Sequence, residues 1–157
     1  MHAVPGDELR ALFRDVPSPV GVVTVEVRGN AAGLTVDSLV SLSADPPLVG
    51  IALGRHAALH ELLREAGSFA ISILASDQEH LAQHFARGVP PIAHWTGIDT
   101  MSGELGAPLL EGAVGWIECR LVSEHEVGDH TLFVGEATLV RRGPGREALV
   151  HLRRAYT

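Results

Sequence analysis

The sequence is short of cysteine, which limits the covalent chemistry open to the chain. Among 157 residues there is one cysteine, Cys119, so an internal disulfide and a metal site made only of cysteines are both excluded. Its neighbours Trp116, Ile117 and Leu121 are apolar. We therefore expect Cys119 to be a small core residue of a strand.

A metal centre is not expected either. His80 and His84 stand four residues apart, a spacing at which two histidines on one helix can bind a metal. No glutamate or third ligand accompanies them in the pattern of a zinc protease. We interpret both histidines as solvated helix residues.

Long apolar runs and an excess of positive charge are also missing. No run reaches the ~18 apolar residues of a membrane span, and the first residues, M-H-A-V-P-G-D-E, lack the basic and apolar regions of a signal peptide. We expect a cytoplasmic protein without a membrane segment. The formal net charge of −7 argues against nucleic acid or an anionic membrane as the main partner.

Several catalytic motifs are absent as well. The chain has no G-x-S-x-G elbow, no cysteine and histidine in the context of a nucleophile, and no G-x-G-x-x-G after a predicted strand. These absences exclude the common signatures of hydrolases and of dinucleotide-binding Rossmann domains.

What the sequence does contain is enough apolar material for one globular domain. Its length of 157 residues and its hydrophobic content of 46% predict a single domain over residues 1–157 with its own core. At the N-terminal end, Leu9, Leu12, Phe13 and Val16 recur at helical spacing. We expect residues 1–16 to contain a short helix that packs on the rest of the domain.

The most distinctive segment is 32–47, A-G-L-T-V-D-S-L-V-S-L-S-A-D-P-P. In an extended conformation one face carries the following residues: Thr35, Asp37, Leu39, Ser41 and Ser43. Polar groups on that face need solvent or a ligand as partner, so the segment fits either a ligand-binding strand or an ordinary edge strand. Ser38 interrupts the apolar face and predicts a bulge or bend near Asp37 and Ser38.

The remaining segments predict a mostly β domain. Strands are expected at 20–27, 48–53, 68–74, 114–125 and 131–140 and in the tail, and helices at 56–66 and 78–87. Without βαβ alternation this order favours an antiparallel barrel with short helices. The junction Gly54-Arg55-His56 between strand and helix could bind a phosphate, or Arg55 could be a solvated loop residue.

Six stretches carry a family resemblance. In order they are G-L-T-V-D-S-L-V-S-L-S-A-D-P-P-L, F-A-I-S-I-L, Q-E-H-L-A-Q-H-F-A, G-A-P-L-L-E-G-A, G-D-H-T-L-F-V-G and L-V-H-L-R-R-A-Y. Together they resemble the flavin reductase family, the small reductase components of two-component flavin monooxygenases. The resemblance covers residues 16–156 and implies an FMN-binding split β-barrel with short helices, of the mostly β (α+β) class.

The resemblance implies an NAD(P)H:flavin oxidoreductase. Hydride would pass from NADH or NADPH to N5 of FMN or FAD, and the reduced flavin would go to a separate monooxygenase. Family members are usually homodimers, so a homodimer is expected. The sequence does not choose between the two flavins or the two nicotinamide nucleotides. A non-catalytic flavin-binding or redox-sensing protein on the same scaffold remains the alternative.

The resemblance also assigns site residues. The segment that lines the isoalloxazine ring, mainly through its backbone, corresponds to Thr35, Val36, Asp37, Ser38 and Leu39. Positions near the ribityl chain and phosphate correspond to Ser41, Ser43, Leu53, Gly54, Arg55 and His56. Positions that approach the flavin correspond to Ala86 and Arg87.

For the nicotinamide side the resemblance points to the G-D-H turn and the tail. His130 is the expected catalytic neighbour of the nicotinamide, although a histidine there could also simply cap a strand. His151 and Tyr156 in the tail are expected near the active site. The tail departs from the family pattern in having Arg153-Arg154 where a glycine is usual, and these two arginines could contact a 2′-phosphate.

Overall fold

The structure is a computed structural model that describes residues 1–87 and 94–157. Its helices are α1 Gly6–Phe13, α2 Ala58–Ala66 and α3 Glu79–Ala86. The strands of the main sheet are β2 Gly21–Val27, β3 Asn30–Val36, β4 Leu39–Ala44, β5 Pro47–Gly54, β6 Ser68–Ile73, β9 Gly115–Val127 and β10 His130–Arg142. The short strands are β1 Ser18–Pro19, β7 Thr100–Met101, β8 Leu109–Leu110, β11 Val150–Leu152 and β12 Ala155–Tyr156.

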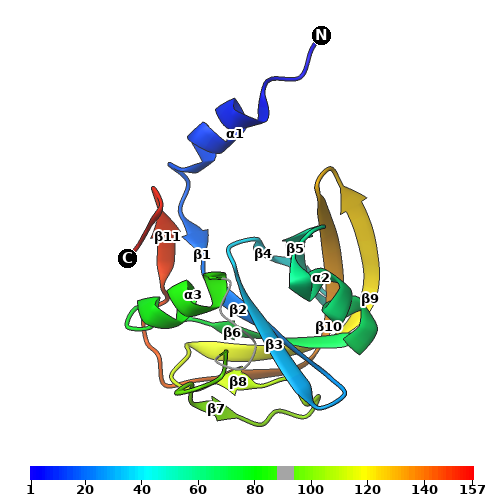
Figure 1. Cartoon of the computed structure of the whole chain (residues 1–157), viewed down its shortest axis with the longest axis vertical. Helices are drawn as coiled ribbons and strands as arrows, with labels where there is room; N and C mark the ends of the chain where they lie inside the picture. The colour runs from blue at the N-terminus through cyan, green and yellow to red at the C-terminus, as the bar shows by residue number, and fades with distance from the viewer. Residues whose placement is uncertain (88–93) are drawn as a thin grey trace.

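The main sheet is antiparallel throughout, in the order β3-β2-β6-β9-β10-β5-β4 (Figure 1). The predicted mostly β, antiparallel architecture is confirmed. Two small sheets accompany it, one of β1, β11 and β12 and the other of β7 and β8. In the first of these, residues near the two ends of the chain pair with each other.

Hairpins explain most of the strand order. β2 and β3 are joined by Arg28 and Gly29, whose φ angles of 51° and 79° are those of the two-residue turn that matches strand twist. The long β9–β10 hairpin shifts register at Val134/Gly135. A Cβ at Gly135 would lie 2.6 Å from Phe69 Cζ, so this irregularity needs a glycine.

Three apolar clusters form the core of the described chain, the smallest of them around Leu109 and Trp116. The largest one contains Val23, Ile51, Phe69 and Phe133 from the sheet and Leu63 from α2. Because strand residues alternate between faces, these side chains gather on one face of the curved sheet, and α2 covers them.

The second cluster attaches α3 and the tail segment to β2. It contains Val22 of β2, Phe85 of α3, and Leu74 and Leu149 of the connecting segments. Since these side chains are all buried, the end of α3 and the segment leading into β11 have fixed positions relative to β2.

Cys119 is fully buried in the largest cluster, as predicted. Burial, with a smaller contribution from the neighbouring Glu118, raises the pKa of the Cys119 thiol to about 12. The side chain is therefore a neutral apolar group at physiological pH.

The expected packing of residues 1–16 on the domain is wrong. Helix α1 buries no residue, and Leu12 and Phe13 are 66% and 60% exposed. Figure 1 shows α1 projecting away from the sheet. An amphipathic pattern indicates that a helix has a face to bury, but it does not say against which surface.

The segment 32–47 is two strands, not one. The predicted bend at Asp37 and Ser38 is confirmed, because β3 ends at Val36 and β4 begins at Leu39. The predicted alternation does not continue across the bend, and Leu39 packs against the core. The tail, predicted as one strand, is a tight hairpin of β11 and β12.

Within residues 1–87 and 94–157, no helix combines the length and the hydropathy needed to cross a membrane.

Candidate active site

The bend between β3 and β4 is held by Ser38. Its Oγ donates a hydrogen bond to the carbonyl oxygen of Ala52 at 2.7 Å and accepts one from the Ala52 amide at 3.1 Å. Thr35 is held in a similar way, because its Oγ1 donates to the carbonyl oxygen of Ala82 in α3 at 2.7 Å. Both hydroxyls therefore fix the backbone, which leaves the peptide groups of this segment as its main means of contacting a ligand.

This segment, α3 and the tail enclose a cavity of about 210 Å³, here called the tail cavity. It is lined by Val20, Thr35, Val36, Asp37, Ala86, His151 and Tyr156. Six of the predicted site residues are thus brought together, although they come from three separate parts of the sequence.

The polar groups of the tail cavity are close to one another. His151 Nδ1 lies 4.0 Å from Asp37 Oδ2, and the rings of His151 and Tyr156 are 5.1 Å apart. Burial, together with the charges of Asp37 and Glu79, raises the pKa of the Tyr156 phenol. Tyr156 therefore keeps its proton and can donate a hydrogen bond.

The tail reaches this position through β1. Ser18 and Pro19 of β1 pair with His151 and Val150 of β11, which places His151 beside the start of β2. The chain then reverses at Arg153 and Arg154, both with positive φ, and β12 returns Tyr156 opposite His151.

A larger cavity of about 550 Å³, here called the α2–α3 cavity, lies between β3 and these two helices. Most of its lining is apolar and includes Leu34, Leu59, Leu62 and Phe85. Ala86 lines both this cavity and the tail cavity, so the two adjoin at the end of α3.

Cations and free amides border the α2–α3 cavity. Arg87 lines it, as does Arg28, which forms an ion pair with Glu65. The first turn of α2 begins after Ala57, which makes no side-chain capping hydrogen bond. Unpaired N–H groups at a helix start, next to an arginine, suit a phosphate group.

The loop before α2 meets the β9–β10 hairpin. Gly54 pairs with His130, and the amide of Arg55 donates to the carbonyl oxygen of Asp129 at 3.1 Å. His130 Nδ1 lies 2.7 Å from Asp129 Oδ1, and this hydrogen bond lowers the pKa of Asp129. His130 is half-exposed and is not among the described residues that line the tail cavity.

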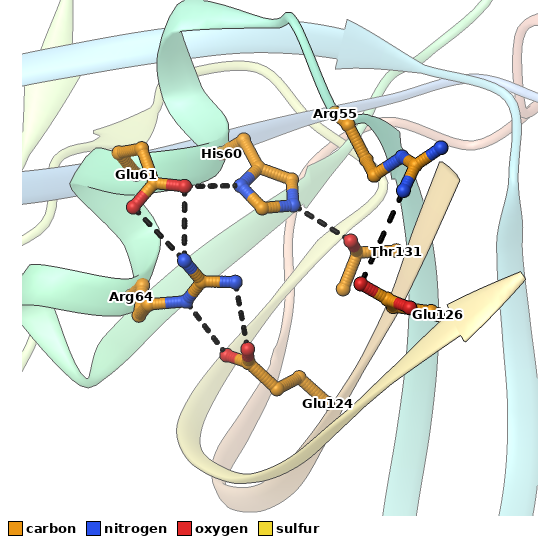
Figure 2. A network of polar contacts seen from close by, with 7 residues as sticks. All are labelled: Arg55, His60, Glu61, Arg64, Glu124, Glu126 and Thr131. Atoms are coloured by element: carbon orange, nitrogen blue, oxygen red, sulfur yellow. Dashed lines mark hydrogen bonds and ion pairs between the residues drawn. The ribbon is translucent and has the colours of Figure 1, made fainter. Parts of the chain in front are cut away.

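Arg55 points toward acidic residues of β9. Its Nη1 lies 4.0 Å from Glu126 Oε1 (Figure 2). His56, the next residue, is exposed in the turn. A phosphate placed here would compete with Glu126 for Arg55, so Arg55 is less available than its position in the sequence suggests.

The rest of the polar network beside Arg55 is structural (Figure 2). Arg64 joins Glu61 of α2 to Glu124 of β9, with N–O distances of 3.0 and 2.7 Å, and its hydrogen bond lowers the pKa of Glu124. The buried His60 bonds through Nε2 to Thr131 Oγ1 at 2.7 Å. These contacts tie α2 to the β9–β10 hairpin.

Several predicted residues line neither the tail cavity nor the α2–α3 cavity: Ser38, Leu39, Ser41, Ser43, Leu53, Gly54, Arg55, His56 and His130. The side chain of Leu53 is buried in the core. Ser41 and Ser43 lie farther along β4, the edge strand that begins after the bend. The structure thus separates these serines from the tail cavity within one chain.

Two arginines at the end of α1 were not predicted as site residues. Arg10 of α1 and Arg14, the residue that follows the helix, line a third cavity with the tail. Their spacing of four residues was the available signal, but nothing in the sequence places α1 next to the tail.

A model of the flavin reductase-like domain matches residues 13–157. An NADH-dependent FAD reductase of Streptomyces globisporus is 41% identical over 91% of this chain and 80% of its own length. An NADH-dependent FMN reductase of Methylorubrum extorquens is 32% identical over 99% of this chain and 90% of its own. The solved flavin reductase component of a bacterial two-component tryptophan halogenase superposes with a TM-score of 0.90 at 35% identity, covering 98% of this chain and 97% of that one.

Proposed function

Because this chain belongs to the flavin reductase-like family, we propose that it catalyses the reduction of FMN or FAD by NADH in the tail cavity and the adjoining α2–α3 cavity. The predicted family, its split-barrel fold and the oxidoreductase class are confirmed by the matches. The observation that carries the placement is that Ala86 borders both cavities while the tail brings His151 and Tyr156 to the segment Thr35–Asp37.

The residues present fit a flavin. The backbone of Thr35, Val36 and Asp37 would hold the ring edge, since the hydroxyl of Thr35 already anchors that backbone to α3. The phosphate would lie at the start of α2 with Arg87 as its cation. When bound there, a flavin would supply the hydride acceptor at its N5 atom.

The chain contributes placement and exclusion of water, not a nucleophile. Tyr156, protonated and partly buried, would donate a hydrogen bond to the bound ligands. His151, which lines the tail cavity, is the proposed neighbour of the nicotinamide and can donate from a ring nitrogen to a carboxamide oxygen. His130 is proposed for the same role on the family resemblance alone. No proton needs to leave either residue for hydride transfer.

The first test is the loss of absorbance at 340 nm with purified protein, NADH or NADPH, and FMN or FAD in all four pairings. We expect turnover that depends on added flavin and is faster with NADH, as the names of the relatives suggest. Flavin binding without turnover in any pairing would contradict the proposal and favour the non-catalytic flavin-binding alternative.

We also propose a homodimer. Leu9, Leu12 and Phe13 of α1 and Val40 and Leu42 of the edge strand β4 are between 44% and 66% exposed, and apolar groups of this kind usually pack against a partner. Light scattering after gel filtration is expected to give twice the mass of one 16.7 kDa chain. A mass near 17 kDa would contradict this.

A separate monooxygenase is the proposed consumer of the reduced flavin. One structural relative is itself the reductase component of a two-component halogenase. The same chemistry supports the cytoplasm as the proposed location, because nicotinamide nucleotides are the expected hydride donors.

A further inference from the structure

The third cavity, about 650 Å³ in volume, lies between α1 and the tail hairpin and is unusually basic for this protein. Its lining includes Arg10, Arg14, Arg153 and Arg154, against one carboxylate, Asp37. The whole chain has 12 basic and 19 acidic residues. A third of the positive side chains are therefore gathered around one cavity of a size typical for ligand sites.

The backbone around this cavity is firmly placed. The amide of Arg153 donates to the carbonyl oxygen of Arg14 at 2.9 Å, and Arg153 Nε donates to Asp15 Oδ1 at 2.9 Å. These bonds join the end of α1 to the tail hairpin. They also keep the backbone of Arg14 beside that of Arg153, so that residues of both segments line the same cavity.

The other arginines are poorly neutralised. Arg10 faces Asp7 at 3.9 Å, with both side chains largely exposed. In the described part of the chain, Arg14 and Arg154 have no carboxylate within 4.0 Å. Arg14 and Arg154 therefore line the cavity without a carboxylate partner within residues 1–87 and 94–157, beside the paired Arg10 and Arg153. Guanidinium groups gathered in this way favour a ligand with two or more negative oxygens.

The turn of the tail carries a further sign of a binding role. Arg153 and Arg154 have φ angles of 51° and 63°, in the left-handed region that glycine and asparagine adopt most easily. An arginine at such a position is conformationally unfavourable. The guanidinium of Arg153 offsets part of this cost through its ion pair with Asp15, whereas Arg154 has no such partner among the described residues.

The third cavity adjoins the proposed reaction site. Asp37 and His151 line both it and the tail cavity. A ligand with an aromatic ring beside His151 and an anionic group a few ångströms farther along would occupy both. A nicotinamide dinucleotide has this form, because a diphosphate joins its nicotinamide half to its adenosine half.

We propose that Arg10, Arg14, Arg153 and Arg154 bind the diphosphate of the nicotinamide dinucleotide. This rests on the proposed function for the identity of the ligand. Helix α1 then acts as one wall of the hydride-donor site, although it packs on no part of the main sheet. Asp37 lies at the boundary with the tail cavity, beside His151, where the uncharged end of the ligand would lie.

The test is a double variant, Arg14→Gln with Arg154→Gln, compared with Arg141→Gln and Arg142→Gln at the exposed end of β10. Both pairs change the net charge equally. Binding of ADP-ribose, which needs no turnover, is measured by calorimetry, and KM for NADH by the absorbance assay. In the Arg14→Gln, Arg154→Gln protein we expect roughly 10- to 100-fold weaker binding of ADP-ribose and a similar rise in KM for NADH. Its flavin affinity should be unchanged within about twofold.

The outcomes separate this proposal from the proposed function. Turnover of NADH with an unchanged KM in the first pair would overturn the arginine assignment and leave the reductase standing. Absence of turnover in the wild type would overturn the reductase, while ADP-ribose binding would still test the cavity. An equal loss in both pairs would show a general charge effect and overturn the assignment.

A third ligand identifies the phosphate that is recognised. If the arginines bind the diphosphate, the Arg14→Gln, Arg154→Gln protein should lose affinity for 2′-phosphorylated ADP-ribose by the same factor as for ADP-ribose. Loss confined to the 2′-phosphorylated ligand would overturn the diphosphate assignment in favour of a 2′-phosphate site.

A single substitution separates binding from folding. Arg154→Gly removes the guanidinium but suits the positive φ, so the melting temperature should stay the same or rise while ADP-ribose affinity falls about 10-fold. An unchanged affinity in this well-folded variant would also contradict the proposal.

Discussion

Replacing Glu118 with alanine is expected to lower the free energy of unfolding by about 3 kcal/mol. The side chain is fully buried in β9. Its two carboxylate oxygens accept hydrogen bonds from the backbone amides of Glu104 and Leu105, at 3.0 and 2.9 Å. The substitution would leave both amides without a partner and open a void beside Gly103, whose position is already in contact with this carboxylate.

Chemical denaturation followed by circular dichroism measures this effect. The matched control is Glu136→Ala, which removes a partly exposed ion pair with Arg120 and should change the unfolding free energy by less than about 1 kcal/mol. Glu118→Gln should fall between the two, because one of its two acceptor oxygens becomes a donor. Equal effects for Glu118→Ala and the control would contradict the structural role.

Replacing Ala86 with leucine is expected to weaken flavin binding by roughly 10- to 100-fold, the usual effect of adding bulk to a filled site. Ala86 is exposed at the end of α3 and lines both proposed flavin cavities. The fold should tolerate the change, because leucine and alanine are both good helix formers and no core contact is altered.

Flavin affinity is measured by fluorescence titration without a nicotinamide nucleotide. Ala44→Leu is the control: Ala44 is also exposed but lies at the β4–β5 turn, at the opposite end of β4 from Asp37. An Ala86→Leu protein that binds flavin as tightly as the control would place the flavin elsewhere. The melting temperatures of both variants establish that the comparison is between folded proteins.

Local patterns predicted the elements of this fold well, because each has a local cause. Strand β2 follows from its β-branched residues, its turn into β3 has a glycine at position 29, and the bend at Asp37 follows from a serine on an apolar face. Cys119 was correctly assigned to the core from its apolar neighbours alone.

The tertiary placement of the site was harder to predict, because it depends on contacts between distant residues. Thr35 and Ser38 look like ligand-binding hydroxyls, yet their hydrogen bonds go to Ala82 and Ala52. Leu53 belongs to the core. The family resemblance supplied the link between the tail and the segment 35–39 that spacing alone could not provide.

Two features escaped prediction for different physical reasons. Arginine is not a usual residue for a tight turn, so the reversal at Arg153 and Arg154 had no sequence signal. Helix α1 has the periodicity of a packing helix, but its connection to the tail through Arg153 and Asp15 holds it clear of the sheet. Its basic residues therefore line a cavity that its apolar pattern did not suggest.

The pairing of β1 with β11 also means that one side of the site depends on residues outside the main sheet. The main sheet ends in chain order at Arg142, before β11 and β12. A chain cut after that residue would keep the residues that line the α2–α3 cavity but would lack His151 and Tyr156. Such a shortened chain is expected to bind flavin without using a hydride donor, and bound flavin would stabilise it.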